Sequence, residues 1–157
     1  MGRIYTAVFS AVAVTADQDL FEVNAPATGM VVIHRVHIGQ SSDPADAEAE
    51  MLQIQLNRGA GSAGSGGTSP TAAPHSVGSA AFGGTVEVNN TTQSAESSGA
   101  QTVIFDECFN VQAGFYHEPA PAARIVVPPS GIFIVNLPEA PADSLTMSGS
   151  ITFEELD

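Results

Sequence analysis

Two histidines, His34 and His37, have the residue type and spacing that come nearest to a metal site in this chain. Metal-binding β-barrels use a His-x-His pair, because alternate residues of a strand point to the same face. The spacing here is His-Arg-Val-His, so an extended strand directs the two rings to opposite faces. We predict hydrogen-bonded structural histidines and no metal site.

The single cysteine, Cys108, follows directly after Asp106 and Glu107. Neighbouring carboxylates disfavour the thiolate form that a nucleophile needs. We therefore expect Cys108 to be a small, buried hydrophobic residue. His117 and Glu118 precede a proline-rich break, where they could form an acid–base pair but are explained equally well as an exposed strand end. We assign no catalytic residue.

The segment Gly59–Gly64 reads GAGSAG and satisfies the dinucleotide-binding pattern G-x-G-x-x-G. That pattern works only when its third glycine opens a helix whose N-terminus holds the pyrophosphate. The residues that follow, SGGTSP, cannot form such a helix. We predict no bound cofactor and no enzymatic activity.

The charge of the chain is strongly acidic, with a formal net charge of −13 over 157 residues and no lysine. Its cations are Arg3, Arg35, Arg58 and Arg124. Nucleic acids are bound through clustered Lys and Arg, so we expect no direct contact with nucleic acid. No apolar run approaches the roughly 20 residues of a membrane-spanning helix, so we expect no membrane partner.

Hydrophobic residues recur with a period of two along most of the chain, which predicts an all-β fold. In the last predicted strand, 144–154, Leu145, Met147, Ile151 and Phe153 face one way, and Gly149 on that face indicates either a bulge or the close approach of a neighbouring strand. The segment 124–137 reads as a β-hairpin that turns at Pro128–Gly131. The strands are predicted at 4–14, 20–23, 30–39, 51–57, 85–88, 101–109, 111–117, 124–127, 132–137 and 144–154. Short strands at near-regular spacing favour an antiparallel β-sandwich, with a jelly roll as first choice, formed by residues 1–157 as a single domain.

Long loops rich in Gly, Ser and Pro interrupt this pattern. We predict one at 58–84, a second polar loop at 89–100 and a solvated acidic loop at 41–50. Loops of such length in compact domains are usually functional. We expect the segment 58–84 to be an arm held against a neighbouring subunit, with Arg58, His75 and Phe82 as its partner contacts.

Three segments of the chain resemble small virion proteins of tailed bacteriophages: LQIQLNRG at 52–59, FNVQAGF at 109–115 and APADSLTMSGSITFEEL at 140–156. The chain is similar to capsid decoration, or cement, proteins. The resemblance implies a β-sandwich or jelly roll made in the host cytoplasm, which forms homotrimers and binds the major capsid protein on the outer capsid surface. No site residues are carried over, because none of these segments contains a functional residue that can be matched.

Two other classes of function stay open at this point. A phage tail or baseplate adhesin, or another carbohydrate-binding module, would need clustered exposed aromatic rings, whereas Trp is absent and Tyr5 and Tyr116 are the only tyrosines. A degenerate cupin-like enzyme would share the jelly roll but needs metal-ligating histidines. Stoichiometric metal or binding to specific glycans would support these alternatives.

Overall fold

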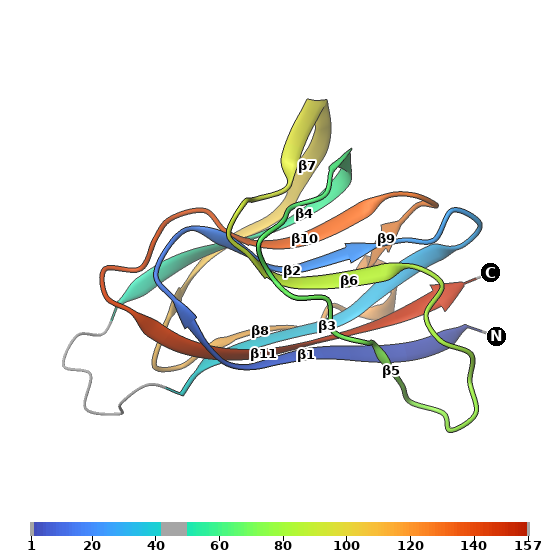
Figure 1. Ribbon diagram of the computed structural model, residues 1–157, viewed down its shortest axis with the longest axis horizontal. Coiled ribbons are helices and arrows are strands. Elements are labelled where there is room, and N and C mark those ends of the chain that lie inside the picture. The colour runs from blue at the N-terminus through green and yellow to red at the C-terminus, as the bar shows by residue number, and fades with distance from the viewer. Residues whose placement is uncertain (1, 42–49, 157) are drawn as a thin grey trace.

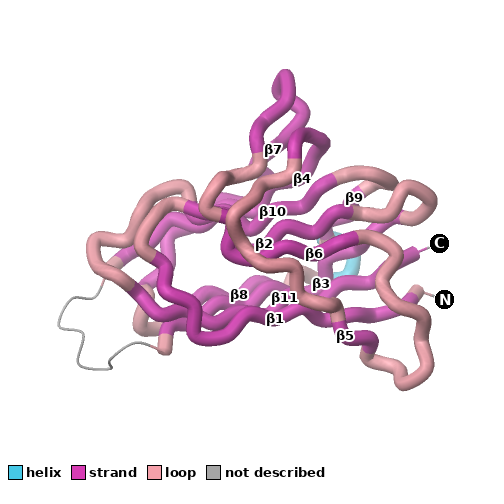
Figure 2. The backbone as a smooth tube through the Cα atoms, in the orientation of Figure 1, coloured by secondary structure: helices cyan, strands magenta, loops and turns pink. Residues whose placement is uncertain are grey.

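The computed structural model describes residues 2–41 and 50–156 and consists almost wholly of β-strands in two antiparallel sheets that face one another (Figures 1 and 2). Most of the acidic loop predicted at 41–50 lies outside the described residues. Among the described residues, no helix is long and apolar enough to cross a membrane. The elements are β1 (Arg3–Val14), β2 (Gln18–Asn24), β3 (Met30–Gln40), β4 (Met51–Ser62), β5 (Ala73–Pro74), β6 (Thr85–Asn90), β7 (Ala95–Asn110), β8 (Phe115–His117), the 3-10 turn η1 (Pro121–Ala123), β9 (Ile125–Val127), β10 (Ile132–Leu137) and β11 (Leu145–Leu156).

The order of the strands is that of a jelly roll, as predicted. Sheet I has the order β5-β1-β11-β3-β8, with β9 also paired to β3, and sheet II has the order β6-β2-β10-β4-β7. The strands from β1 to β4 alternate between the two sheets, and the late strands β10 and β11 insert between the early ones. This interleaving of early and late strands in both sheets is the double Greek key of a jelly roll, to which β5 and β6 add at the edges.

The period-two pattern places the apolar residues in a core between the sheets. In β4, Leu52, Ile54 and Leu56 are buried in that core, whereas the intervening Gln53 and Gln55 face outward, as the sequence predicted. The core-facing residues of β11 are likewise buried.

Gly149 of β11 packs closely against side chains of both neighbouring strands, which confirms the second of the two interpretations of its position on the apolar face. A Cβ added there would lie 2.6 Å from Cε1 of Phe9 and 2.9 Å from Cδ1 of Ile38. Both neighbours are buried side chains of flanking strands, so the site is filled from each side.

Three local predictions were wrong because they depend on pairing between distant residues. The segment 124–137 is not a hairpin: β9 pairs with β3 in sheet I, and β10 pairs with β2 and β4 in sheet II. The turn at Pro128–Gly131 therefore carries the chain from one sheet to the other. The loop predicted from 58 begins only after Ser62, and the loop predicted at 89–100 gives way to β7 at Ala95, because β4 and β7 pair as far as Ser62 and Ala95.

The remaining part of the Gly/Ser/Pro-rich segment, residues 63–84, is called the covering loop below. Its first part lies along its own chain, and the stretch that follows β5 bulges outward before the chain returns to β6 (Figure 1). Its contact with a neighbouring subunit stays a prediction. Near its start the loop crosses the outer face of sheet II, where the backbone N–H of Gly64 donates a hydrogen bond of 2.8 Å to Oε2 of Glu22. It then bridges to β6 through Thr68 and Val88, and reaches sheet I where β5 pairs with Tyr5 and Thr6 of β1.

Two buried carboxylates lie on the outer face of sheet II, and the covering loop bonds to one of them, Glu22. Glu22 has no solvent-exposed surface and also accepts hydrogen bonds from the side-chain amides of Asn24 and Asn90. Asp19 is similarly buried, and its carboxylate accepts a 2.6 Å hydrogen bond from the backbone N–H of Ser94 and a 2.9 Å bond from Nδ2 of Asn136. Burial raises the pKa of Asp19 to about 6, against the two hydrogen bonds, which lower it. The outer face of sheet II over β2 and β10 is thus closed by the chain itself.

Replacing Gly149 by Ala should destabilise the protein by about 1–3 kcal/mol, because the added methyl group overpacks a filled site. Gly39→Ala provides the matched control, since Gly39 lies on the neighbouring strand and a Cβ there meets nothing within 4 Å. That variant should be neutral or more stable by up to about 1 kcal/mol. Urea unfolding measures both free energies, and equal values for the two variants would contradict the close packing at Gly149.

The stability of the protein should depend on pH through Asp19. Its pKa rises from the ordinary 3.8 to about 6 on folding, so the folded state binds the proton more tightly. The group therefore adds stability as the pH falls through about 6 towards about 4, by on the order of 2–3 kcal/mol, and this contribution is lost as the pH rises again. Asp19→Asn should remove that part of the pH dependence, because an amide of the same shape does not titrate and Asn136 can reverse its own amide to keep the hydrogen bond.

The measurement is urea unfolding between about pH 7 and about pH 4. The control is Asp143→Asn, which removes an exposed carboxylate from a loop. In this variant the free energy of unfolding should change with pH as it does in the wild-type protein. If Asp19→Asn also showed the wild-type change with pH, Asp19 would not be the cause of this effect.

Candidate protein-binding face

The outer face of sheet I, called the exposed face below, carries more exposed large apolar side chains than the strands of sheet II do. Nine large hydrophobic side chains are exposed in the described part of the chain, and five of them belong to this face: Ile4, Val8, Met30, Tyr116 and Val126. Val8 is 56% exposed and Tyr116 is 58% exposed. Exposed apolar side chains that share one face are typical of a surface that binds another protein.

A row of hydrogen-bonding side chains crosses the exposed face from one edge of sheet I to the other. Nε2 of His75, next to β5, lies 2.7 Å from Oγ1 of Thr6 on β1, which lies 3.0 Å from Oγ1 of Thr152 on β11. Nη2 of Arg35 on β3 lies 3.5 Å from the same Thr152 hydroxyl. The row ends at Tyr116 on β8, whose hydroxyl group lies beside Arg35 and donates a hydrogen bond to Glu118. The Glu118 carboxylate raises the pKa of Tyr116 through this bond. We refer to these residues as the polar row.

Basic side chains of an acidic protein also lie on this face. They are Arg35, His34, His37 and His75, in a chain whose formal net charge is −13 with histidine counted as neutral. Two carboxylates lie close to these side chains, and each already has a partner. Oε2 of Glu154 is 3.1 Å from Nε2 of His34, and Glu118 accepts a hydrogen bond from the hydroxyl group of Tyr116.

The strands of sheet II are mainly acidic, with six acidic residues and Arg58. The acidic residues are Asp19, Glu22, Glu87, Glu96, Asp106 and Glu107. The exposed face instead carries Arg35 and three histidines beside Glu118 and Glu154, and Arg35 is the group there that suits an acidic protein surface.

The two histidines that were predicted to point apart lie on the same face, so that prediction was wrong. The pairing of β3 with β11 contains a bulge between Ile33 and Arg35, and the extra residue changes which side chains face outward. Ile33 and Val36 are buried in the core, and His34, Arg35 and His37 point away from it. His34 pairs with Glu154, and the ring of His37 lies 6.0 Å from that of Tyr116, edge to face. Within residues 2–41 and 50–156, no group of three or more His, Cys, Asp and Glu side chains is arranged to hold a metal ion.

The three predicted partner-contact residues lie in different places. His75 belongs to the polar row of the exposed face and is solvent-accessible. Arg58 is exposed at one end of the sandwich, where Nη1 donates a 3.0 Å hydrogen bond to the carbonyl oxygen of Val126. Beside Arg58 is an open hollow of about 630 Å³, lined also by Thr102 and the turn Pro128–Gly131. Partner contact by His75 and by Arg58 stays a prediction.

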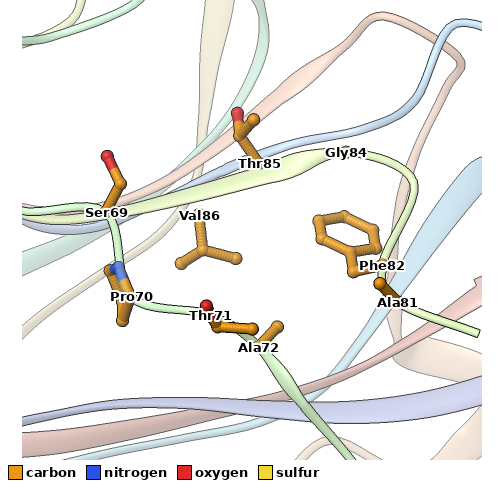
Figure 3. Close-up of a pocket in the computed structure, with 9 residues that line it drawn as sticks. All are labelled: Ser69, Pro70, Thr71, Ala72, Ala81, Phe82, Gly84, Thr85 and Val86. Carbon is orange, nitrogen blue, oxygen red and sulfur yellow. The ribbon is translucent and has the colours of Figure 1, made fainter.

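Phe82 requires a correction, because it anchors the covering loop to its own core rather than projecting to a partner. Its ring centroid lies 4.8 Å from that of Phe153 and 5.5 Å from that of Tyr5, and the Tyr5 hydroxyl donates to the carbonyl oxygen of Ala80. Figure 3 shows Phe82 and Val86 on one side of a crevice of about 230 Å³, opposite residues 70–72 of the same loop. None of the nine residues that line the crevice is titratable, so it offers only hydroxyl groups and apolar contacts.

Cys108 is exposed on β7, so the prediction of a buried residue was also wrong. Phe105 and Phe109 take the inward positions of β7, which leaves Asp106 and Cys108 facing outward. β7 is the end strand of sheet II, and its outward side chains remain open to solvent.

Comparison with known proteins leaves the chain without an assigned family. No protein-family model matches it, and no curated protein does. Among solved structures, it is similar at 10% sequence identity to a chain in the structure of infectious bursal disease virus, Gx strain, with a TM-score of 0.22. The similarity covers 99% of this chain but 41% of the viral one, so this chain spans less than half the length of that neighbour. The assignment as a jelly roll therefore rests on the order and pairing of the strands.

Proposed function

We propose that the protein is a virion structural protein of a tailed bacteriophage, which decorates the outer capsid surface and stabilises it by binding the major capsid protein. In this proposal it acts as a homotrimer, is made in the host cytoplasm and catalyses no reaction. The observation that carries the proposal is the exposed face of sheet I, where apolar side chains, hydroxyl groups and Arg35 lie together on one sheet.

The composition of this face suits recognition of a protein surface. Tyr and Arg are enriched in protein interfaces, and Tyr116 and Arg35 lie side by side in the polar row. Ile4, Val8 and Val126 add apolar area around them. Arg35 favours an acidic partner surface, and its charge adds selectivity and association rate more than affinity.

The position of the resembling segments is consistent with this proposal. APADSLTMSGSITFEEL contains β11, which lies in sheet I between β1 and β3 and supplies Thr152 to the polar row. FNVQAGF joins β7 to β8, the strand that carries Tyr116. LQIQLNRG forms most of β4 and places Arg58 at the end of the sandwich. The resemblance thus extends to strands that build the exposed face.

Many weak contacts become strong when identical copies bind a repetitive surface together. Once one copy in a homotrimer has bound, the other two copies are held close to neighbouring capsid subunits, which raises the effective concentration for their binding. A modest interface on each copy is then sufficient to hold neighbouring capsid subunits together. This accounts for a face that is only partly apolar.

Two single variants test whether the exposed face binds the capsid. Val8→Glu and Val126→Glu each add a negative charge to the face at an exposed position, so the core is untouched. Each should weaken binding to purified expanded capsids about tenfold or more, which corresponds to about 1.4 kcal/mol. Co-sedimentation over a range of protein concentrations measures this binding, and light scattering of the free protein measures the expected trimer.

Val77→Glu is the matched control, because it makes the same chemical change at a fully exposed position in the covering loop, outside the face. It should bind capsids as the wild type does. The proposal would be abandoned if the wild-type protein were monomeric and failed to sediment with capsids. Specific hits on a glycan array without capsid binding would favour an adhesin instead.

A further inference from the structure

The sandwich has unpaired edge strands, and most of them carry a feature that prevents another strand from pairing with them. In sheet I, β5 has two residues and ends at Pro74, and β8 and β9 have three residues each, with Pro119 and Pro128 close behind. Very short strands and prolines are known protections of a sheet edge. The longer free edge of β1 is interrupted by a bulge between Phe9 and Val12.

The β6 edge of sheet II is protected by the chain itself. The backbone of Thr68 in the covering loop exchanges both hydrogen bonds with Val88, with N···O distances of 3.0 and 2.8 Å. The covering loop therefore occupies the position that an added strand would take.

The edge formed by β7 lacks these protections. β7 is 16 residues long, contains neither Pro nor Lys, and is the last strand of sheet II. Its segment Phe105–Asn110 pairs in unbroken register with Met51–Leu56 on one side, and no strand of the described residues pairs with its other side. The bulge at Ile104 lies just before this segment, so six consecutive residues present a regular free edge.

The side chains along this edge are acidic and apolar. Asp106 and Glu107 are both exposed, and Val103 and Ile104 next to them are 45% and 43% exposed. The Asp106 carboxylate accepts hydrogen bonds from the side-chain amides of Gln53 and Gln55, at 2.8 to 3.0 Å, which fix its position without neutralising its charge. A strand that adds here would therefore meet a fixed negative charge on the outer side and that of Glu107 on the inner side.

We propose that the edge Phe105–Asn110 of β7 is a strand-addition site for an extended, basic segment of a different protein chain. Backbone hydrogen bonds to the free edge would supply affinity, and Lys or Arg side chains opposite Asp106 and Glu107 would supply selectivity. A second copy of this chain is the less favourable occupant, because each copy has a formal net charge of −13 and pairing two β7 edges brings two sets of these carboxylates together. This surface lies on sheet II, beside the exposed face of sheet I, and binding to it goes beyond the proposed function.

The test uses the purified protein and a fluorescein-labelled peptide of alternating Lys and Val residues, followed by fluorescence polarisation at low ionic strength. We expect saturable binding. The double variant Asp106→Asn with Glu107→Gln should weaken it about tenfold, because it removes both charges while keeping the size and hydrogen-bonding capacity of the side chains. The same peptide with methyl groups on alternate backbone nitrogens keeps its charge but cannot pair with a strand, and it should lose binding to a similar extent.

The control variant, Glu139→Gln with Asp143→Asn, removes two exposed carboxylates from a loop and should leave peptide binding unchanged. Equal binding of the methylated and unmethylated peptides would overturn the proposal, since it would show charge attraction without strand pairing. The proposal would also be overturned if the double variant at Asp106 and Glu107 and the control variant at Glu139 and Asp143 lost peptide binding to the same extent. A disulfide-linked dimer through Cys108, together with a dimer in light scattering, would assign the edge to a second copy and also reject it. No capsid is present in this assay, so its result is independent of capsid binding.

Discussion

The buried carboxylate of Glu22 is the constraint from which the asymmetry of the molecule follows. A buried carboxylate is costly unless hydrogen-bond donors surround it. Here the donors come from the backbone of Gly64 and the side chains of Asn24 and Asn90. Since Gly64 belongs to the covering loop, the loop must close over sheet II for the fold to tolerate Glu22. With this part of sheet II closed, the outer face of sheet I carries five of the nine large apolar side chains that are exposed in the described residues.

The small residues of the covering loop make this closure possible. A Cβ at Gly64 would lie 2.7 Å from the carbonyl oxygen of Thr92 and 2.8 Å from Nδ2 of Asn90, and one at Gly67 would lie 2.1 Å from the carbonyl oxygen of Val88. Only glycine allows such close approach of one backbone to another. At the far end of the loop, the Phe82 ring packs on Tyr5 and Phe153. Composition that is typical of a flexible linker serves in this protein to fit a loop tightly onto its own sheet.

The sequence was sufficient for features that depend on neighbouring residues along the chain. The alternation of Leu52, Ile54 and Leu56 with polar residues is local, and it predicted both the strand and its buried face. Gly149 was likewise identified from its place among alternating apolar residues. Features that depend on distant pairing were not predictable in this way. The bulge that turns His34 outward arises from the register with β11, and the crossing from β9 to β10 arises from which strands are available as partners. The polar row was missed for the same reason, since it joins four strands.

The two surfaces proposed for binding meet along one side of the sandwich. Phe105 of β7 contacts the ring of His117 on β8 at a centroid distance of 4.7 Å, and Phe115 lies behind them in the core. Burial among these rings lowers the pKa of His117, which favours its neutral form and keeps this contact apolar. The aromatic contact thus lies between the acidic edge of β7 and the side of the exposed face that carries Tyr116 and Arg35. Tyr116 precedes His117 in the sequence, and Glu107 is close enough to His117 to act on its charge, so a strand added at β7 would come near the exposed face.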